Sequence, residues 1–302
     1  MISSPIHSSF LLKFIVSLCL FFLATMIFEN PQINSFQTKY SDTVNSDYRN
    51  GTTLKLTTGS FYLPKDNKVR PQGEDAHFTC KARNTIGIAD GVGGWGSKGI
   101  DAGEYARELM TNSLTAVLNQ NKGSINPVRV LQSAYRTTHS KGSSTACIIA
   151  LNDNNVLRYA NLGDSGFILF RGKKFLYRSP VQHHEFNCPY QLGSGSRDTP
   201  NLAYEEEIQV EDGDIIVAAT DGLFDNVYPH DIEKILNRNK SDDPYKLASE
   251  IVEHALINSV DENYFSPFAK AAAAEGFKHK GGKYDDITVV VAKIELDLHK
   301  SS

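Results

Sequence analysis

The sequence predicts an α+β fold in which two antiparallel β-sheets pack face to face between outer layers of helices. Short apolar segments joined by hairpin-like turns indicate antiparallel strands. Segments with a helical apolar period are grouped between these strands, and a regular strand–helix–strand alternation is absent. Because amphipathic helices must bury their apolar faces against a sheet, we expect a four-layer α-β-β-α sandwich.

The expected strands are short apolar runs bounded by turn residues. They are Thr53–Thr57, Phe78–Cys80, Thr85–Ala89, Thr145–Leu151, Val156–Leu162, Gly166–Arg171, Lys174–Arg178, Glu205–Val210, Asp214–Thr220 and Ile287–Ile294. The connections Asn152–Asn155, Gly172–Lys173 and Glu211–Gly213 are short and polar, as hairpin turns require. These turns join neighbouring strands and therefore favour antiparallel pairing.

The first expected helix starts after Asp101, which has the residue type of an N-cap, and Glu104 completes a capping-box-like pair. A second helix follows Pro127, because proline suits the first helical turn. Further helices are expected at three segments with apolar periodicity. These are His230–Asn237, Pro244–Ser259 and Ser266–Glu275.

The chain of 302 residues divides by composition into four parts. Residues 1–28 contain the uncharged run Phe14–Phe28 and are expected to be a signal anchor or a targeting segment that associates with a membrane through residues 10–28. A buried core helix is the alternative for this run. Residues 29–51 resemble a polar linker, residues 52–296 form the expected catalytic domain, and residues 297–302 are a polar tail.

Composition excludes several classes of function. The net charge is −4 and no basic stripe is present, so nucleic acid is not an expected partner. The four cysteines are far apart and form no Cys-x-x-Cys motif, which argues against a zinc site or a disulfide framework. A monomer is expected.

Four aspartates lie at the edges of apolar runs, beside glycine or another acidic residue. They are Asp75, Asp90, Asp221 and Asp285. Carboxylates at the ends of buried strands need a partner, and no lysine or arginine recurs beside them in the sequence. A divalent cation held by oxygen ligands from separate strand ends is the expected partner. The pattern therefore indicates a metal-dependent hydrolase.

Oxygen ligands of this type select Mg²⁺ or Mn²⁺ over zinc or copper. Two such ions about 4 Å apart share a bridging water and acidify it, and the resulting hydroxide attacks a phosphorus atom in line. Each Asp-Gly pair taken alone is equally typical of an ordinary turn. Specificity comes from the whole set of motifs and from their order along the chain.

The ordered motifs resemble one family. They are Glu74-Asp-Ala-His, Ala89-Asp-Gly-Val-Gly-Gly, Gly142-Ser-Ser-Thr-Ala, Asn161-Leu-Gly-Asp-Ser-Gly, Thr220-Asp-Gly-Leu-Phe-Asp and Asp285-Asp-Ile-Thr-Val-Val. Together they are similar to the metal-dependent serine/threonine protein phosphatases of the PP2C (PPM) family, from about Leu54 to Ile294. The segments Gly87-Ile-Ala-Asp-Gly-Val-Gly-Gly-Trp, Gly163-Asp-Ser-Gly-Phe and Ser179-Pro-Val-Gln resemble the PTC7-like branch.

The resemblance implies an enzyme that removes phosphate from phosphoserine and phosphothreonine in phosphoproteins, with two Mg²⁺ or Mn²⁺ ions at one end of a β-sandwich. It also implies a mitochondrial or plastid location. Carried over by position, the metal-site residues are Glu74, through a water, and Asp75, Asp90, the carbonyl of Gly91, Asp221 and Asp285. Asp90 would bridge both ions. A third, weaker ion is implied at Asp164 and Asp225, and Arg70 would bind the substrate phosphate. A solvated loop charge is the alternative for Arg70.

One position departs from the family pattern. Many members have histidine two residues after the bridging aspartate, where this chain has Val92. His77 is a candidate substitute as general acid, although a histidine satisfied by hydrogen bonds within its strand is the favoured interpretation. His183 and His184 are adjacent on an extended segment and point to opposite faces, so we expect surface or packing roles rather than a metal pair.

Two alternatives to an active phosphatase remain. The first is a catalytically inactive binding module that keeps the fold, which the absence of the histidine favours and the intact aspartates oppose. The second is an unrelated two-metal hydrolase such as a phosphodiesterase, although those sites usually include histidine. Hydrolysis assays on phosphate monoesters and diesters distinguish these readings.

Overall fold

The structure is a computed structural model, and it describes residues 53–67, 71–239 and 243–298. Contacts divide the chain into Met1–Gly51 and Thr52–Ser302, and the described residues all belong to the second unit. Within them, every helix is too short or too polar to cross a membrane. The anchor expected at residues 10–28 and the linker at 29–51 lie outside the described residues, so both stay predictions.

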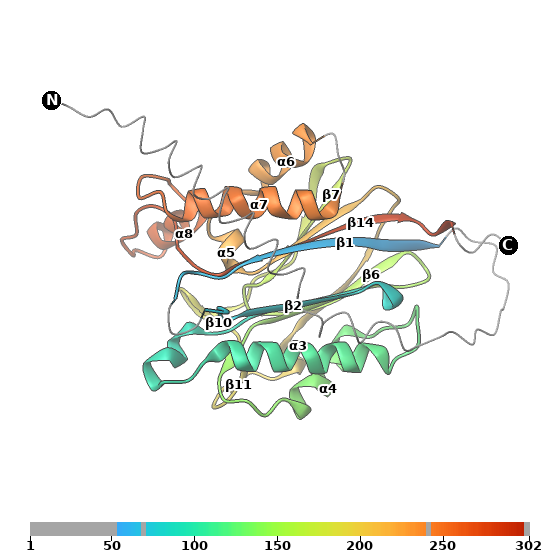
Figure 1. Cartoon of the computed structure of the whole chain (residues 1–302), viewed down its shortest axis with the longest axis horizontal. Helices are drawn as coiled ribbons and strands as arrows, with labels where there is room; N and C mark the ends of the chain where they lie inside the picture. Colours follow the sequence, from blue (N-terminus) through green and yellow to red (C-terminus); the bar gives the residue numbers. More distant parts are fainter. Residues whose placement is uncertain (1–52, 68–70, 240–242, 299–302) are drawn as a thin grey trace. The chain divides into compact units, whose positions relative to one another are not determined.

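Two five-stranded antiparallel sheets form the centre of this unit (Figure 1). The first has the order β1-β14-β13-β7-β8, with bounds Leu54–Leu63, Ile287–Leu296, Ile215–Ala219, Gly166–Arg171 and Lys174–Arg178. The second has the order β12-β6-β5-β3-β2, with bounds Tyr204–Gln209, Val156–Leu162, Ala146–Leu151, Thr85–Asp90 and Asp75–Cys80. The predicted antiparallel pairing is confirmed in both sheets.

The inner core lies between the two sheets. Strand β3 points Ile86 and Ile88 into it, and both side chains are fully buried. They share this layer with Phe167 of β7 and Val290 of β14. Because side chains alternate across a strand, Ala89 of β3 lies on the opposite face, in the second cluster beneath the helices. Both faces of the central strands are therefore buried.

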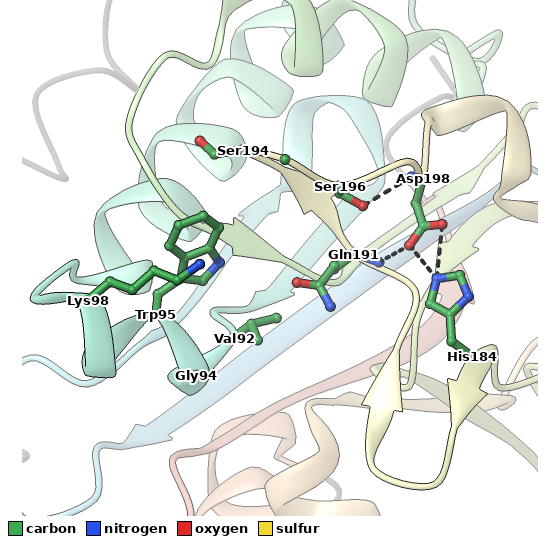
Figure 2. A pocket seen from close by; sticks show the side chains of 10 residues that line it. Val92, Gly94, Trp95, Lys98, His184, Gln191, Ser194, Ser196 and Asp198 are labelled. Atoms are coloured by element: carbon green, nitrogen blue, oxygen red, sulfur yellow. Dashed lines mark hydrogen bonds and ion pairs between the residues drawn. The ribbon is translucent and has the colours of Figure 1, made fainter.

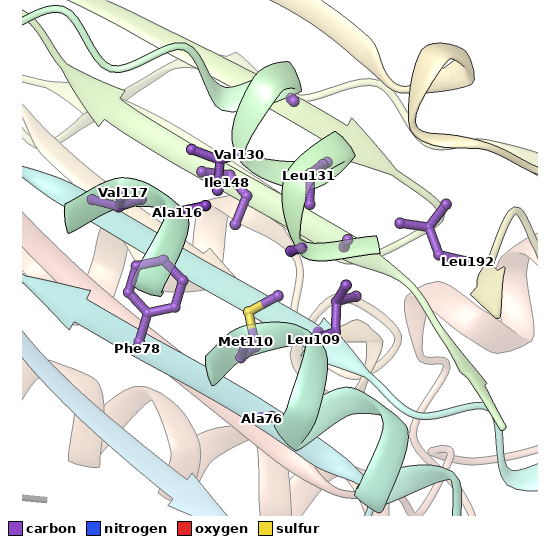
Figure 3. Close-up of a cluster of buried hydrophobic side chains, with 14 of the residues drawn as sticks. Ala76, Phe78, Leu109, Met110, Ala116, Val117, Val130, Leu131, Ile148 and Leu192 are labelled. Carbon is purple, nitrogen blue, oxygen red and sulfur yellow. The ribbon is translucent and has the colours of Figure 1, made fainter. Parts of the chain in front are cut away.

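Helices cover the outer face of each sheet. Helices α3 (Ala102–Leu118) and α4 (Pro127–Thr137) pack on the sheet that contains β2 and β5, where Leu109, Leu131 and Ile148 share one apolar cluster (Figure 3). Helix α7 (Pro244–Ser259) packs on β1 and β14. Helix α6 (Pro229–Arg238) contacts α7 and β8, and α8 (Pro267–Ala274) lies on the α7 side of the sheets in Figure 1. The four-layer prediction is confirmed.

The cap of α3 is also confirmed, because the Asp101 side chain accepts a hydrogen bond from the Gly103 amide at 2.9 Å. The structure adds short elements that the sequence did not indicate. They are β4 (Ser143–Ser144), β9 (His183–Glu185), β10 (Cys188–Pro189), β11 (Leu192–Gly193), η1 (Lys81–Arg83), η2 (Gly93–Lys98), η3 (Pro200–Leu202) and α5 (Asp221–Phe224). Segments of two to six residues are too short to show a period, so only tertiary contacts define them.

Candidate metal centre

The four aspartates come from strand ends that meet at one end of the sandwich. Asp75 is the first residue of β2 and Asp90 the last residue of β3, and the two are direct cross-strand partners. Asp221 begins α5, and only Thr220 separates it from the end of β13. Asp285 precedes β14, which pairs with β13. Antiparallel pairing within each sheet and the packing of the sheets thus bring together residues more than 200 positions apart.

Asp75 is held by two hydroxyl groups from the opposite sheet. Its Oδ2 atom accepts hydrogen bonds from Thr220 Oγ1 at 2.8 Å and from Thr288 Oγ1 at 2.7 Å. These threonines lie just after β13 and within β14, so the bonds join the two sheets at the candidate centre. The side chain is almost fully buried and its orientation is fixed before any ligand binds.

Three carboxylate oxygens in this region fit a cation. Among the residues that the structure describes, the Oδ1 atoms of Asp75, Asp164 and Asp221 are buried and accept no hydrogen bond. A buried acceptor without a partner is costly, and a divalent cation would relieve that cost. These oxygens therefore have the chemistry of the donor set that Mg²⁺ or Mn²⁺ prefers.

The raised pKa values of Asp75 and Asp90 also favour a bound cation. Burial, reinforced by the charges of Asp221, Asp75 and Asp285, raises the pKa of Asp90 well above its usual value. Burial and the charge of Asp286 likewise raise the pKa of Asp75. Carboxylates that crowd one another in this way gain from a nearby positive charge.

Two lysines lie among the carboxylates, which corrects the expectation that no basic residue accompanies them. Lys65 Nζ is 2.8 Å from Asp285 Oδ1 and 3.6 Å from Glu74 Oε2. Lys283 Nζ donates to Oδ2 of Asp221 at 2.5 Å. The sequence does not reveal these contacts because Lys65 comes from the segment after β1 and Lys283 reaches across from the loop before β14.

Lysines partly take the role expected of metal ions. Within the described ranges, no set of three or more histidine, cysteine, aspartate or glutamate side chains has the geometry of a ready metal site. The structure brings the acidic residues to one region and leaves three buried carboxylate oxygens without a hydrogen-bond donor from the described residues, but it does not arrange these residues as a complete metal site. The individual metal ligands therefore stay predictions.

Glu74 and Gly91 lie side by side at the start of β2. The Gly91 amide donates to the Glu74 carbonyl at 3.0 Å. A Cβ atom at position 91 would lie 2.6 Å from that same oxygen, so glycine is required for this approach. The Glu74 side chain is buried, and a Cβ atom on Gly93 would come within 3.2 Å of its Oε2. Ligation through the Gly91 carbonyl stays a prediction.

The residues predicted for a third ion have partners from the chain. Asp164 Oδ2 is 3.1 Å from His183 Nε2, and Asp225 Oδ2 is 2.7 Å from Lys283 Nζ. Burial raises the pKa of Asp225 to about 7, with Asp221 adding to the shift and Lys283 opposing it. Arg70, the predicted phosphate ligand, lies outside the described residues.

The histidines differ in role. The half-buried His77 hydrogen-bonds Ser60 Oγ at 3.0 Å, and burial lowers its pKa to about 4. It is satisfied by a hydrogen bond as expected, although the partner lies on β1 of the other sheet and not in its own strand. His183 and His184 are both exposed and the His184 ring stacks on Tyr190, as expected of surface and packing residues, and each also has one acidic partner. His183 faces Asp164, whereas His184 Nε2 pairs with Asp198 at 2.9 Å.

Asp286 is a residue of the site that sequence reasoning missed. Its Oδ1 accepts from the Lys65 amide at 2.8 Å and its Oδ2 accepts from the Glu74 amide at 3.0 Å. It therefore fixes both segments that carry the lysine and the glutamate of the centre. The only sequence signal was its place beside Asp285, and adjacency alone does not separate a ligand from a structural carboxylate.

Lowering the pH from about 8 to about 6 in the presence of a chelator is expected to raise the melting temperature. The folded-state pKa values of Asp75, Asp90 and Asp225 are raised, so each carboxyl binds its proton more tightly when folded. Protonation of such a carboxyl favours the folded state. Its contribution to the free energy of unfolding is fully present below the unfolded-state pKa and is lost as the pH rises through the folded-state pKa. Asp221, whose pKa Lys283 lowers against the effect of burial, titrates below this window.

Differential scanning calorimetry with and without Mg²⁺ checks this expectation. The stabilisation by Mg²⁺ should be larger at pH about 8 than at pH about 6, because bound metal competes with protons for the same oxygens. A melting temperature of the metal-free protein that falls on acidification through this range would contradict the raised pKa values.

Comparisons with known proteins identify the family and the fold of this chain. Residues 81–295 match the family described as Stage II sporulation protein E (SpoIIE). The chain is 50% identical over 244 residues to "Probable protein phosphatase 2C 55" of Arabidopsis thaliana, covering 80% of this chain and 52% of that protein. It is 38% identical over 263 residues to "Protein phosphatase PTC7 homolog" of Danio rerio, covering 78% of this chain and 88% of that protein.

Solved structures share the fold. The photosystem II phosphatase PBCP superposes with a TM-score of 0.74 at 32% identity, covering 80% of this chain and 99% of that one. The catalytic domain of the serine/threonine phosphatase PstP, solved with two manganese ions, has the same fold at a TM-score of 0.58 and 17% identity, covering 80% of this chain and all of that one.

The match to Arabidopsis phosphatase 55 spans about half of that relative, and a second Arabidopsis relative, "Probable protein phosphatase 2C 80", is covered over 59% of its length. The zebrafish relative is covered over most of its length. The family match includes most of the described unit, from the end of β2 to the end of β14. The chain therefore belongs to the protein phosphatase 2C family.

Proposed function

We propose that this protein is a metal-dependent protein phosphatase that hydrolyses phosphoserine and phosphothreonine monoesters in phosphoproteins. The observation that carries the proposal is the crowding of Asp75, Asp90 and Asp221 at one end of the sandwich, with buried oxygens that accept no hydrogen bond from the described residues. Membership of the protein phosphatase 2C family supports the reaction class.

Two Mg²⁺ or Mn²⁺ ions per chain would supply Lewis acidity and an acidified water for attack on phosphorus. The protein would hold them through Asp75, Asp90, Asp221 and Asp285. The hydrogen bonds from Thr220 and Thr288 orient Asp75 in advance. Such preorientation reduces the reorganisation needed when charge develops on the substrate phosphate.

Hydrolysis of p-nitrophenyl phosphate tests the proposal directly. We expect activity that requires Mn²⁺ or Mg²⁺, is abolished by chelation, and is lost in Asp90→Asn, which keeps the size of the side chain and removes its charge. Equal rates for Asp90→Asn and the parent protein would show that the centre is not catalytic, as for an inactive binding module. Activity on phosphate diesters alone would replace the phosphatase assignment with a phosphodiesterase.

A pocket beside the centre is suited to the part of a phosphoprotein that flanks the phosphorylated residue. The cavity has a volume of about 400 Å³ and is lined by η2 and the segment from β9 to Asp198 (Figure 2). Val92 in its wall lies two residues after Asp90, and Gly94 follows the glycine that abuts Glu74. Strand β9 lies between the candidate metal centre and the pocket, because His183 faces Asp164 and His184 lines the pocket.

The walls of this pocket are fixed by side-chain hydrogen bonds. Trp95 Nε1 donates to Ser143 Oγ at 2.6 Å, and the same hydroxyl donates to Gln191 Oε1 at 2.6 Å. Lys98 Nζ lies 4.6 Å from the centre of the Trp95 ring, on the rim (Figure 2). Asp198 Oδ2 lies 2.9 Å from His184 Nε2 and accepts from the Gln191 amide at 2.9 Å, so this carboxylate is engaged within the wall. Lys98 is the cation at the rim, and it favours an acidic side chain near the phosphoserine.

Replacing Lys98 by methionine is expected to raise KM about tenfold for phosphopeptides with glutamate beside the phosphoserine, and to change KM little for peptides with alanine there. A loss of about 1.4 kcal/mol of binding corresponds to this factor. Turnover of p-nitrophenyl phosphate should stay the same, because that substrate has no flanking residues. Lys122→Met, at an exposed position outside the pocket, is the matched control. Equal KM changes for both peptides would contradict an acidic preference.

A further inference from the structure

Lys283 occupies the space between two carboxylates of the centre. Its Nζ atom is 2.5 Å from Asp221 Oδ2, 2.7 Å from Asp225 Oδ2 and 3.8 Å from Asp285 Oδ2. Only 17% of its side chain is exposed. A buried ammonium with three acidic neighbours compensates charge where a metal ion would otherwise do so. This is a different role from that of a surface lysine.

Hydrogen bonds with Asn226 hold the backbone of Lys283 against the end of α5, next to Asp225. Asn226 Oδ1 accepts from the Lys283 amide at 2.9 Å, and Asn226 Nδ2 donates to the Lys283 carbonyl at 2.8 Å. The same Nδ2 also donates to the Gly222 carbonyl at 2.9 Å within α5. Asn226 is fully buried and directly follows Asp225, so these hydrogen bonds set the distance between Lys283 and Asp225.

The aromatic ring of Phe268 limits the freedom of the lysine side chain. The ring centre lies 5.1 Å from Lys283 Nζ, within the range of a cation–π contact. The ammonium is therefore held by carboxylates, an aromatic face and a fixed backbone. Moving it out to solvent would break these contacts and leave Asp221 and Asp225 facing each other without compensation.

Asp164 offers too little to hold a divalent ion alone. Its Oδ2 is engaged by His183, which leaves one free oxygen, Oδ1, on this side of the centre. Mg²⁺ and Mn²⁺ need several oxygen ligands and neutralisation by more than one carboxylate. With Asp225 taken by Lys283, the pair expected to bind a third ion is incomplete.

We propose that Lys283 is a built-in cation that takes the place of a third divalent ion, so that this protein binds no metal at Asp164 and Asp225. The inference deepens the proposed function, since it specifies how many ions the same centre takes. Asp221 keeps Oδ1 free for a metal while its Oδ2 binds the ammonium. The carboxylate oxygens of the centre thus fall into two groups, those that bind the lysine and those left for metal ions.

Isothermal titration of the full chain with Mn²⁺ tests the proposal, after removal of metal with a chelator. The parent protein should bind about two ions, and Lys283→Met should bind about one more, because the uncharged side chain frees Asp225 and Asp221 Oδ2. Lys280→Met, at an exposed position in the same loop, is the matched control and should bind as the parent does. A Lys283→Met protein that is folded and binds no additional ion would overturn the proposal.

A second variant keeps the test decisive should Lys283→Met fail to fold. Asp225→Asn in the presence of Lys283 should leave the number of bound Mn²⁺ ions unchanged, because Asp225 holds only the lysine. Loss of an ion in Asp225→Asn would also overturn the proposal. Both results are ion counts, so they are separate from hydrolysis. A protein without phosphatase activity would disprove the proposed function and leave the role of Lys283 to be judged by the counts alone.

Discussion

Asp221→Ala is expected to lower kcat by about 1,000-fold or more while the protein stays folded. The variant loses the buried Oδ1 atom that accepts no hydrogen bond from the described residues and that we assign to a metal ion. Loss of a metal-centred interaction removes several kcal/mol of transition-state stabilisation, and each 1.36 kcal/mol corresponds to a factor of about ten in rate. The measurement is steady-state hydrolysis of p-nitrophenyl phosphate over a range of Mn²⁺ concentrations.

The fold should survive because Asp221 repels Asp90 in the metal-free state, and relief of that repulsion offsets the loss of the ion pair with Lys283. Its charge contributes to the raised pKa of Asp90, and Lys283 keeps a partner in Asp225 after the substitution. We expect the melting temperature of the metal-free variant to stay within about 3 °C of the parent value, which is about 1 kcal/mol for a domain of this size. Glu205→Ala, an exposed acidic position on β12, is the control for loss of a carboxylate. A large fall in the melting temperature would make Asp221 a structural residue.

Asp286→Ala is expected to destabilise the fold strongly, in contrast to Asp221→Ala. The substitution leaves the backbone amides of Lys65 and Glu74 without their acceptors. A buried donor that loses its partner costs about 1–3 kcal/mol, so the two together destabilise the fold by about 3 kcal/mol. That corresponds to a fall in melting temperature of about 10 °C, measured by calorimetry in the presence of a chelator.

The neighbouring residue provides the matched control for this prediction. Asp285 is more exposed than Asp286. Within the described residues it pairs with the Lys65 and Lys283 side chains and accepts from the Asp286 amide, whereas the Lys65 and Glu74 amides donate to Asp286. Asp285→Ala should therefore lose activity with only a small change in metal-free stability. If Asp285→Ala and Asp286→Ala lower the melting temperature equally, the division between a ligand and a structural carboxylate is wrong.

The main elements of the fold were predictable from local patterns. Apolar alternation and polar turns indicated the hairpin of β7 and β8, and the residue type of Asp101 indicated the start of α3. These features depend on residues a few positions apart, so the period of side chains along a strand or helix reveals them. Strand β1 extends to Leu63, beyond its predicted end, because its pairing with β14 continues through a polar segment.

Glycine in β1 illustrates what such patterns do not contain. A Cβ atom on Gly59 would lie 2.2 Å from the Tyr245 amide of α7, so the helix approaches the strand at a point where no side chain is present. The sequence pattern treats this glycine as a weak strand residue. Its use depends on a helix nearly 190 positions away along the chain.

The sequence by itself determined the family, the layer order and the set of acidic residues that we propose as metal ligands. Only the tertiary structure decided how the charges of that set are shared: Lys65 and Lys283 enter the cluster, and Asp286 ties its segments together. The physical reason is range. Periodicity and turn chemistry act between neighbours along the chain, whereas charge compensation acts between whichever side chains the packed sheets bring within a few ångströms.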